Sequence, residues 1–205
     1  MCLLVEFPSL LYLHAIMLTF ECLRCGKCCM SITERIYNVP MGLALFPDEV
    51  ALFANADVRP FIGIENGTGI VPVWFQMLKA PCPYYNHERF ECTIYRRRPV
   101  VCRAYPFKVV LNYTRLGRCT WLANQIFKRN MVLPPEITRA NRTIAAYDRT
   151  VFDRVELEQI RLYNVETNEW IAVQDLAHTE TAAEFNPPVM EMMRGEWNGW
   201  RCKRN

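Results

Sequence analysis

Four cysteines stand within eight consecutive residues near the start of the chain: Cys22, Cys25, Cys28 and Cys29. Two intervening residues let a tight turn direct two sulfur atoms into one small volume, while backbone N–H groups of the turn face the same thiolates. Gly26 supplies the backbone freedom that such a turn needs. Four more cysteines follow in order: Cys82, Cys92, Cys102 and Cys119. The pattern predicts that these eight thiols converge to bind metal.

A disulfide framework also uses cysteines in even number, and the chain contains 10. Such frameworks belong mainly to small secreted chains that lack a hydrophobic core. This chain has 205 residues, of which 51% are hydrophobic, so it can bury an ordinary core. A metal or iron–sulfur site is therefore favoured over disulfides. We expect Cys2 and Cys202 to lie apart from the other eight.

The first twenty residues are apolar, but they do not form a typical signal peptide. They lack a basic n-region and a small-x-small cleavage site, and they contain Glu6 and Pro8. Those two residues also leave fewer than the roughly 18 uninterrupted apolar residues of a spanning helix. We expect a cytoplasmic protein without a membrane partner. Met17 is an alternative start, so residues 1–16 are either an over-extended gene start or a strand or helix added to the core.

The charge balance does not predict a nucleic-acid partner, because 24 basic and 21 acidic residues leave a net charge of +3. Several arginines nevertheless stand beside cysteines. A zinc ion with four thiolates carries about −2. Neighbouring guanidinium groups would offset that charge and hydrogen-bond to sulfur. We expect this role for Arg98 and Arg103, whereas Arg96 and Arg97 are equally consistent with a solvated basic face.

Turn signals and apolar periodicity predict the elements that hold the cysteines. Proline and acids at 46–49 predict a short helix through Ala54. A turn at 65–69 separates two predicted strands, Phe61–Ile64 and Ile70–Leu78. A second turn, Asn86–Arg89, would place Cys82 and Cys92 near the base of one hairpin.

After that hairpin, Ile94–Arg98 is predicted as a helical turn ended by Pro99, which returns Cys102 to the site. An apolar stripe predicts one long helix over 137–163, with Asp148 among the charges of its outer face. Residues 170–173 resemble a strand. The predicted fold class is α+β, with a small cysteine-rich metal-binding core and a β-hairpin packed against a long C-terminal helix. The predicted domains are 17–120, which binds metal, and 121–205, a helical extension packed on it.

The cysteines belong to a longer ordered motif. It reads Phe20-x-Cys22-x2-Cys25-Gly26-x-Cys28-Cys29, then Pro81-Cys82-Pro83, then Cys92-x-Ile94-Tyr95-x2-Arg98-Pro99-x2-Cys102-Arg103-x-Tyr105-Pro106-Phe107. Over about residues 20–120 the chain resembles the CxxCxxCC cysteine-cluster family, the YkgJ-type group of zinc- or iron-chelating domains. The resemblance implies a metal-binding or iron–sulfur protein. A related pattern in flagellin lysine N-methylases would imply protein lysine methylation with S-adenosylmethionine.

Ligand counting leaves zinc and iron–sulfur open. Each zinc ion or [4Fe-4S] cluster takes four ligands, so eight cysteines could serve two centres. Cys22-x2-Cys25-x2-Cys28 with a remote Cys82-Pro83 is similar to a ferredoxin arrangement, and this spacing favours iron–sulfur. Cys29 would then belong to a second centre or be a nearby reactive thiol. His87 could replace one sulfur, although a solvated turn histidine is the simpler interpretation.

The sequence leaves the reaction open. It has no GxGxxG, no P-loop and no Cys-x3-Cys-x2-Cys run. One class is a structural or electron-transfer protein with an unidentified protein or redox partner. The other is an enzyme, such as an iron–sulfur oxidoreductase or the methylase above, with an open coordination position on iron. Tyr95, Tyr105 and Glu91 are candidates for acid–base work, although packing and surface roles explain them more simply.

Overall fold

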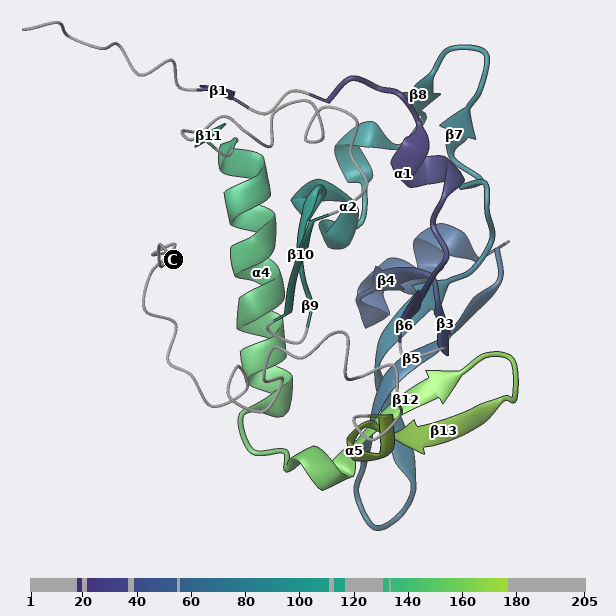
Figure 1. The fold of residues 1–205 in the computed structure, drawn as a ribbon, viewed down its shortest axis with the longest axis vertical. Helices are drawn as coiled ribbons and strands as arrows, with labels where there is room; N and C mark the ends of the chain where they lie inside the picture. Colours follow the sequence, from purple (N-terminus) through teal and green to yellow (C-terminus); the bar gives the residue numbers. More distant parts are fainter. Residues whose placement is uncertain are drawn as a thin grey trace, which may run out of the picture.

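A five-stranded antiparallel sheet forms the largest element of the fold (Figure 1). The computed structural model describes residues 18–19, 22–36, 39–54, 56–110, 113–116, 131–132 and 134–176. The strand order is β13-β12-β5-β6-β4. The bounds are β4 Leu43–Leu45, β5 Val58–Glu65, β6 Ile70–Met77, β12 Ile160–Asn164 and β13 Glu169–Ala172. Strands from before and after residue 120 therefore share one sheet.

The remaining strands form two-stranded pairs. These are β1 Leu18–Thr19 with β11 Met131–Val132, β2 Glu34–Ile36 with β3 Val39–Met41, β7 Tyr85–Asn86 with β8 Glu91–Cys92, and β9 Phe107–Val110 with β10 Tyr113–Leu116. The α-helices are α1 Lys27–Met30, α2 Val100–Ala104, α4 Pro135–Phe152 and α5 Val173–Leu176. Three 3-10 helices are η1 Pro47–Phe53, η2 Tyr95–Arg97 and η3 Leu157–Gln159.

The predicted hairpin at the turn 65–69 is confirmed, and β5 and β6 pair antiparallel with shifts of register around Ile62. Asn66 directs the turn, because its backbone N–H donates to the Gly69 carbonyl at 3.0 Å and its side-chain oxygen accepts from the Thr68 hydroxyl at 2.8 Å. Gly67 and Gly69 both have positive φ angles, which glycine tolerates. The sequence therefore determines this part of the sheet locally.

Aromatic side chains join the sheet to the long helix α4. The ring of Phe46 lies 4.7 Å from that of Trp74 and 4.4 Å from that of Tyr147, measured between centroids. Ile144 of α4 and Ile62 of β5 are fully buried in the same cluster. α2 packs on α4 as well, so the core extends from the sheet to the segment that carries Cys102.

The prediction of one helix over 137–163 is wrong in its second half. α4 ends at Phe152, and after η3 the chain enters β12. Ile160 and Leu162 are buried and pair with β5. Their alternation fits a strand as well as a helical stripe, and pairing with an existing strand decides between the two.

Asp148 is a second correction, because it does not lie on the charged outer face of the helix. Its side chain is only 3% exposed and accepts a hydrogen bond from the indole Nε1 of Trp74 at 3.0 Å. Burial of a carboxylate requires such partners. The sequence prediction placed Asp148 on the outer face because of its charge alone, and so it missed the burial of this side chain.

Other expectations are confirmed within small boundary shifts. The short helix expected through Ala54 is η1, the turn expected at 94–98 is η2, and the strand expected at 170–173 is β13. The mixed α+β class is confirmed, while the cysteine-rich core of that prediction stays a prediction. In the ranges that the structure describes, no helix is both long and apolar enough to traverse a bilayer. Residues 1–16, Cys119 and Cys202 lie outside the described residues.

Replacing Trp74 by phenylalanine should destabilise the fold. The variant removes a buried donor from Asp148, which costs about 1–3 kcal/mol, and it leaves a cavity beside Phe46. Urea unfolding measures the loss. The matched control is Trp170→Phe, because Trp170 lies on the partly exposed strand β13. Equal losses for both variants would show that the Asp148 hydrogen bond has no special importance.

Candidate metal centre

The loop that carries the first four cysteines turns at Gly26. Gly26 has φ +71, and the backbone N–H groups of Cys29 and Met30 donate to its carbonyl at 2.8 and 2.9 Å. Arg24 also has a positive φ, of 52. The turn leads directly into α1, which carries Cys28 and Cys29. The expected use of Gly26 as a turn residue is therefore confirmed.

Tyr85 of β7 covers this turn. A Cβ atom added to Gly26 would lie 2.1 Å from the Tyr85 hydroxyl oxygen, so the ring occupies the space that a larger residue would need. Desolvation against the loop and the nearby Cys29, Cys25 and Cys28 thiolates raise the pKa of Tyr85. The sequence analysis did not single out Tyr85. Its only signal is its place in a hairpin between two motif cysteines.

The hairpin β7–β8 carries Cys82 just before it and Cys92 in its second strand, opposite Tyr85. The backbone N–H of Cys82 donates to the Cys29 carbonyl at 2.8 Å, which fixes the hairpin against α1. Backbone N–H groups of Tyr84 and Ile94 donate to the sulfurs of Cys82 and Cys92 and lower the pKa of those thiols, against the larger raising effect of burial. N–H donation to sulfur stabilises the thiolate, which is the form that binds metal.

Cys102 enters the site on α2, and Glu49 holds the start of that helix. The Glu49 carboxylate accepts the backbone N–H of Val100 at 2.7 Å and that of Phe46 at 3.1 Å. Burial raises the pKa of Glu49, and these two N–H groups act in the opposite direction. One carboxylate therefore connects η1 with the helix that positions Cys102.

Five thiols lie close together: Cys28, Cys29, Cys82, Cys92 and Cys102. Except for Cys29 with Cys92, each of them raises the pKa of another, or has its own pKa raised by it, through charge repulsion. The hydrogen bond with Cys28, followed by burial, raises the pKa of Cys29, and burial is the main cause for Cys82 and Cys102. The Cys28 and Cys29 sulfurs lie 3.9 Å apart, well beyond a disulfide bond of about 2.05 Å.

The other cysteines lie around this central group. Burial and the thiolates of Cys28 and Cys22 raise the pKa of Cys92, so Cys92 connects the central group with the start of the loop. Cys22 and Cys25 are exposed, as is Cys28 of the central group. Cys119 lies outside the described residues, so its expected convergence stays a prediction.

The two candidate arginines are placed differently. Arg98 lowers the thiol pKa of Cys92 and Cys102 by its positive charge, while its Nε donates to the Tyr95 carbonyl and it forms an ion pair with Glu136 at 3.0 Å. Arg103 lowers the pKa of Glu49, and its buried Nε has no hydrogen-bond partner among the described residues. Arg98 therefore has the clearer electrostatic effect on the thiols.

The donor set fits a thiophilic metal, because soft thiolates select zinc and iron–sulfur clusters. In the described ranges, no three Cys, His, Asp or Glu side chains already have the arrangement of ligands around one ion. Binding would thus have to draw neighbouring sulfurs together, and it would remove the charge repulsion that raises their pKa.

The remaining candidates lie at the edge of the site. His87 is exposed and its ring contacts that of Tyr85 at 4.9 Å between centroids. Glu91 pairs with Arg89 at 3.8 Å, and the guanidinium of Arg98 stacks over the Tyr95 ring at 3.8 Å. Tyr105 is partly buried beside α2. These contacts support the packing and surface interpretation given above for the two tyrosines and Glu91.

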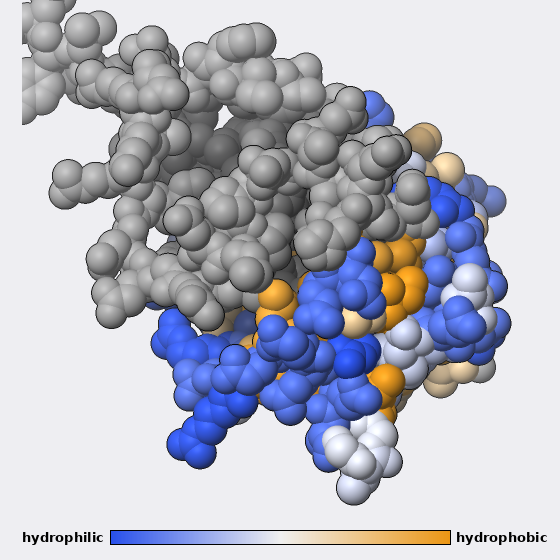
Figure 2. Space-filling view, turned by 60° about the horizontal axis from the view of Figure 1, so that its bottom comes forward, coloured by the Kyte–Doolittle hydropathy of each residue, from blue (hydrophilic) through white to orange (hydrophobic). Residues whose placement is uncertain are grey.

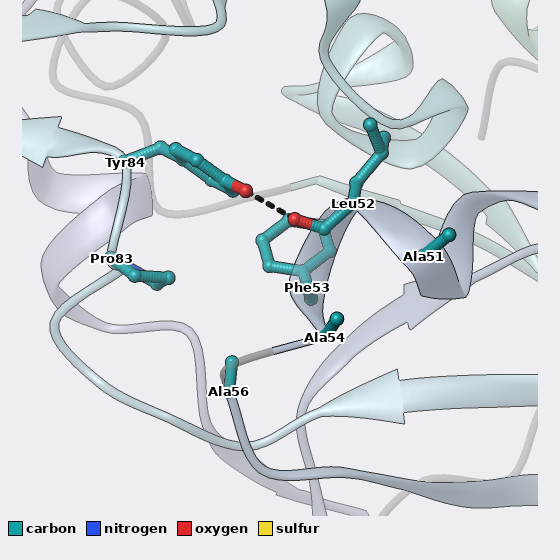
Figure 3. A pocket seen from close by; sticks show the side chains of 7 residues that line it. All are labelled: Ala51, Leu52, Phe53, Ala54, Ala56, Pro83 and Tyr84. Atoms are coloured by element: carbon teal, nitrogen blue, oxygen red, sulfur yellow. Dashed lines mark hydrogen bonds between the residues drawn. The ribbon is translucent and has the colours of Figure 1, made fainter.

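A small cavity opens beside the Cys82 segment (Figure 3). Its lining combines η1 with Pro83 and Tyr84, and the Tyr84 hydroxyl donates to the Leu52 carbonyl. The volume of about 240 Å³ is below the roughly 300–1,000 Å³ of typical small-molecule sites. The cavity therefore lends no support to an S-adenosylmethionine site.

Comparison with known proteins identifies the family. The family model CxxCxxCC, described as a "putative zinc- or iron-chelating domain", matches residues 21–125, and the chain belongs to this family. The match spans the loop, the hairpin and α2. No curated protein and no solved structure is significantly similar to the chain. The family assignment therefore supports metal binding and leaves the kind of metal centre open.

The turn at Gly26 provides a test of the packing against Tyr85. Gly26→Ala should lower both thermal stability and metal content, because the added Cβ collides with the Tyr85 ring. Gly67→Ala is the matched control, since Gly67 has a similar φ of +74 but nothing within 4 Å of an added Cβ. Both variants incur the backbone strain of about 1 kcal/mol, so only the clash separates them. Equal melting temperatures would contradict the packing role.

The metal-free protein should become less stable as the pH rises into the alkaline range. Because the thiol pKa values are raised in the folded state, the folded protein keeps thiol protons at a pH at which the unfolded chain loses them. The free energy of unfolding should therefore fall as the pH rises above 9.0, the ordinary thiol pKa. Thermal melts of chelator-treated protein measure this fall. The melting temperature of the metal-loaded protein should fall less over the same pH range. Cys102→Ser should reduce the fall in the metal-free protein. A melting temperature that stays constant above pH 9.0 would contradict the close placement of buried thiols.

Proposed function

We propose that this protein binds metal through cysteine thiolates and that Cys28, Cys29, Cys82 and Cys102 hold one ion. The proposal is supported by the charge interaction within every pair of these four thiols, and the 3.9 Å between the Cys28 and Cys29 sulfurs favours Cys29 over Cys92 as the fourth ligand. The four thiols come from α1, the segment before β7 and α2, which are far apart in the sequence. Metal bound here would cross-link the three segments, and its binding free energy would contribute to folding.

The spacing of the vicinal pair supports a single tetrahedral ion. Zinc–sulfur bonds of about 2.3 Å in tetrahedral geometry separate neighbouring sulfurs by about 3.8 Å. The Cys28 and Cys29 sulfurs are 3.9 Å apart. In a cubane cluster each cysteine binds a different iron, which gives no reason for such a close pair. A zinc ion, or one iron ion, is therefore our first candidate, and Cys29 becomes a ligand of the same ion as Cys28.

Cys22, Cys25 and Cys92 remain for a second centre. Cys92 interacts through charge with Cys22 as well as with Cys28, Cys82 and Cys102, and it receives the Ile94 N–H on its sulfur. Cys119 would complete a set of four. The charge of Arg98 favours the thiolates of Cys92 and Cys102, so it would support both centres.

An iron–sulfur cluster is the second candidate, and the ferredoxin-like spacing of the sequence favours it. Its ligands would be Cys22, Cys25, Cys28 and Cys82, and it would supply one-electron transfer to a redox partner or to an oxidoreductase reaction. The lysine methylase alternative would need S-adenosylmethionine as well. Both candidates use thiolates, which a reducing cytoplasm preserves, and cytoplasmic localisation is part of this proposal.

Two single substitutions separate the candidates. If Cys29 binds the single ion, Cys29→Ser should remove one metal equivalent, whereas Cys22→Ser should leave that ion in place and lower the metal content only by what a second centre holds. The cluster candidate predicts that Cys29→Ser leaves the metal content unchanged and that Cys22→Ser loses iron together with sulfide, because its ligand set contains Cys22 and not Cys29. Metal and acid-labile sulfide are measured on protein purified under anaerobic conditions. Zinc without sulfide supports the single ion, and iron with equal sulfide supports the cluster.

Cys202→Ser is the control, since Cys202 is expected to lie apart from the centre. A folded protein that contains neither metal nor sulfide, and that takes up neither after reconstitution, would overturn both candidates. Loss of metal in every cysteine variant including the control would show that metal content does not report on specific ligands.

A further inference from the structure

Most of the large apolar side chains that are solvent-exposed in the described part of the protein lie on the segments that carry the cysteines. Leu23 is 52% exposed, Met30 47%, Phe90 61% and Tyr95 43%. Leu23 and Met30 lie at the two ends of the loop and α1, Phe90 at the tip of the hairpin and Tyr95 in η2. Val71, the other large exposed apolar residue in the described ranges, lies on β6 beside the β5–β6 turn.

These segments form one end of the molecule. α1 and the β7–β8 hairpin lie side by side at the upper right of Figure 1, and the Cys82 N–H to Cys29 carbonyl bond and the Tyr85–Gly26 contact hold them together. Figure 2 turns the opposite end towards the viewer, and the described residues there are mainly hydrophilic with a few hydrophobic groups among them. Four of the five large exposed apolar side chains in the described ranges lie at the cysteine end, and exposed apolar groups that gather in one region are typical of binding sites.

The same end carries exposed positive charge. The exposed cations are Arg24, Lys27, Arg89, Arg96 and Arg97. Residues 22–31 contain no acid, and residues 82–98 contain Glu88 and Glu91, of which Glu91 pairs with Arg89. Arg98 directs its charge to the thiols and Glu136, whereas the five cations above are in contact with solvent. We define the docking face as these five cations with Leu23, Met30, Phe90 and Tyr95.

We propose that the docking face binds a protein partner whose surface presents acidic side chains around an apolar patch. Aromatic residues, methionine and arginine are the residues enriched at protein interfaces, and this face combines them. Its cations would meet the partner's carboxylates, which steers association and disfavours wrong partners. A second copy of this chain fits poorly, because a symmetric contact would place the same cations opposite one another. The proposal does not depend on which metal the cysteines hold.

The interaction can be tested with the metal-loaded full chain and a fluorescent amphipathic peptide that carries glutamate and leucine. Anisotropy should show binding that weakens as salt increases, because charge contributes. Matched peptides replace every glutamate by glutamine or every leucine by serine, and each should bind at least about tenfold more weakly if both properties are recognised.

Protein variants locate the contact. Phe90→Ser and Arg96→Glu should each weaken binding of the glutamate–leucine peptide about tenfold. Val71→Ser and Arg142→Glu are matched controls for apolar exposure and charge, since both residues are exposed and lie on β6 and α4. Circular dichroism and metal content are measured for each variant, so that loss of binding is separated from loss of the fold or the centre.

Several outcomes would overturn the proposal. One is equal affinity for the glutamate and glutamine peptides, and another is equal loss in the docking-face and control variants. Tighter binding of vesicles with phosphatidylserine, or of a single-stranded oligonucleotide, through Phe90 and Arg96 would assign the face to a membrane or a nucleic acid instead. Self-association that Phe90→Ser abolishes would assign it to a second copy.

Discussion

Closely placed thiols oppose ionisation, and this constraint shapes the cysteine end of the protein. Burial removes the hydration that a thiolate needs, and each neighbouring thiolate adds repulsion. Both effects raise the pKa of Cys29, Cys82 and Cys102. Without a cation the stable form of this cluster is therefore protonated. With a bound cation, the same proximity that opposed ionisation provides several ligands at once.

The rest of the fold maintains that proximity through contacts that do not involve sulfur. A backbone hydrogen bond fixes Cys82 to the turn of α1, the Tyr85 ring fills the space above Gly26, and Glu49 holds the helix that carries Cys102. α2 in turn packs on α4, which the Phe46, Trp74 and Tyr147 rings join to the sheet. The hydrophobic core thus positions α2, and local hydrogen bonds position the loop and the hairpin. Metal binding would add a third connection between elements that already touch.

Local signals in the sequence predicted the local features of this structure. The β5–β6 hairpin follows from its Asn-Gly-Thr-Gly turn, and the loop turn follows from Gly26 between cysteines. Features that depend on distant contacts were missed. Asp148 was assigned to the surface because its partner, Trp74, is 74 residues away. Residues 160–163 were assigned to a helix because nothing in the sequence shows that they pair with β5. Tyr85 was missed for the same reason, because only the folded chain brings its ring over Gly26.

The cysteines also differ in their contact with solvent, and the difference runs across the two proposed sets. Cys29, Cys82, Cys92 and Cys102 are partly buried, whereas Cys22, Cys25 and Cys28 are exposed. Desolvation strengthens electrostatic interactions, so the buried thiols gain most from a bound cation and suit a structural cross-link. Exposed thiols gain less and remain reachable from outside. Leu23 and Arg24 of the docking face stand between Cys22 and Cys25 in the sequence. A partner that covers this face would therefore also cover the exposed thiols Cys22 and Cys25, and its binding would change their exposure to solvent while the partly buried thiols stayed as they were.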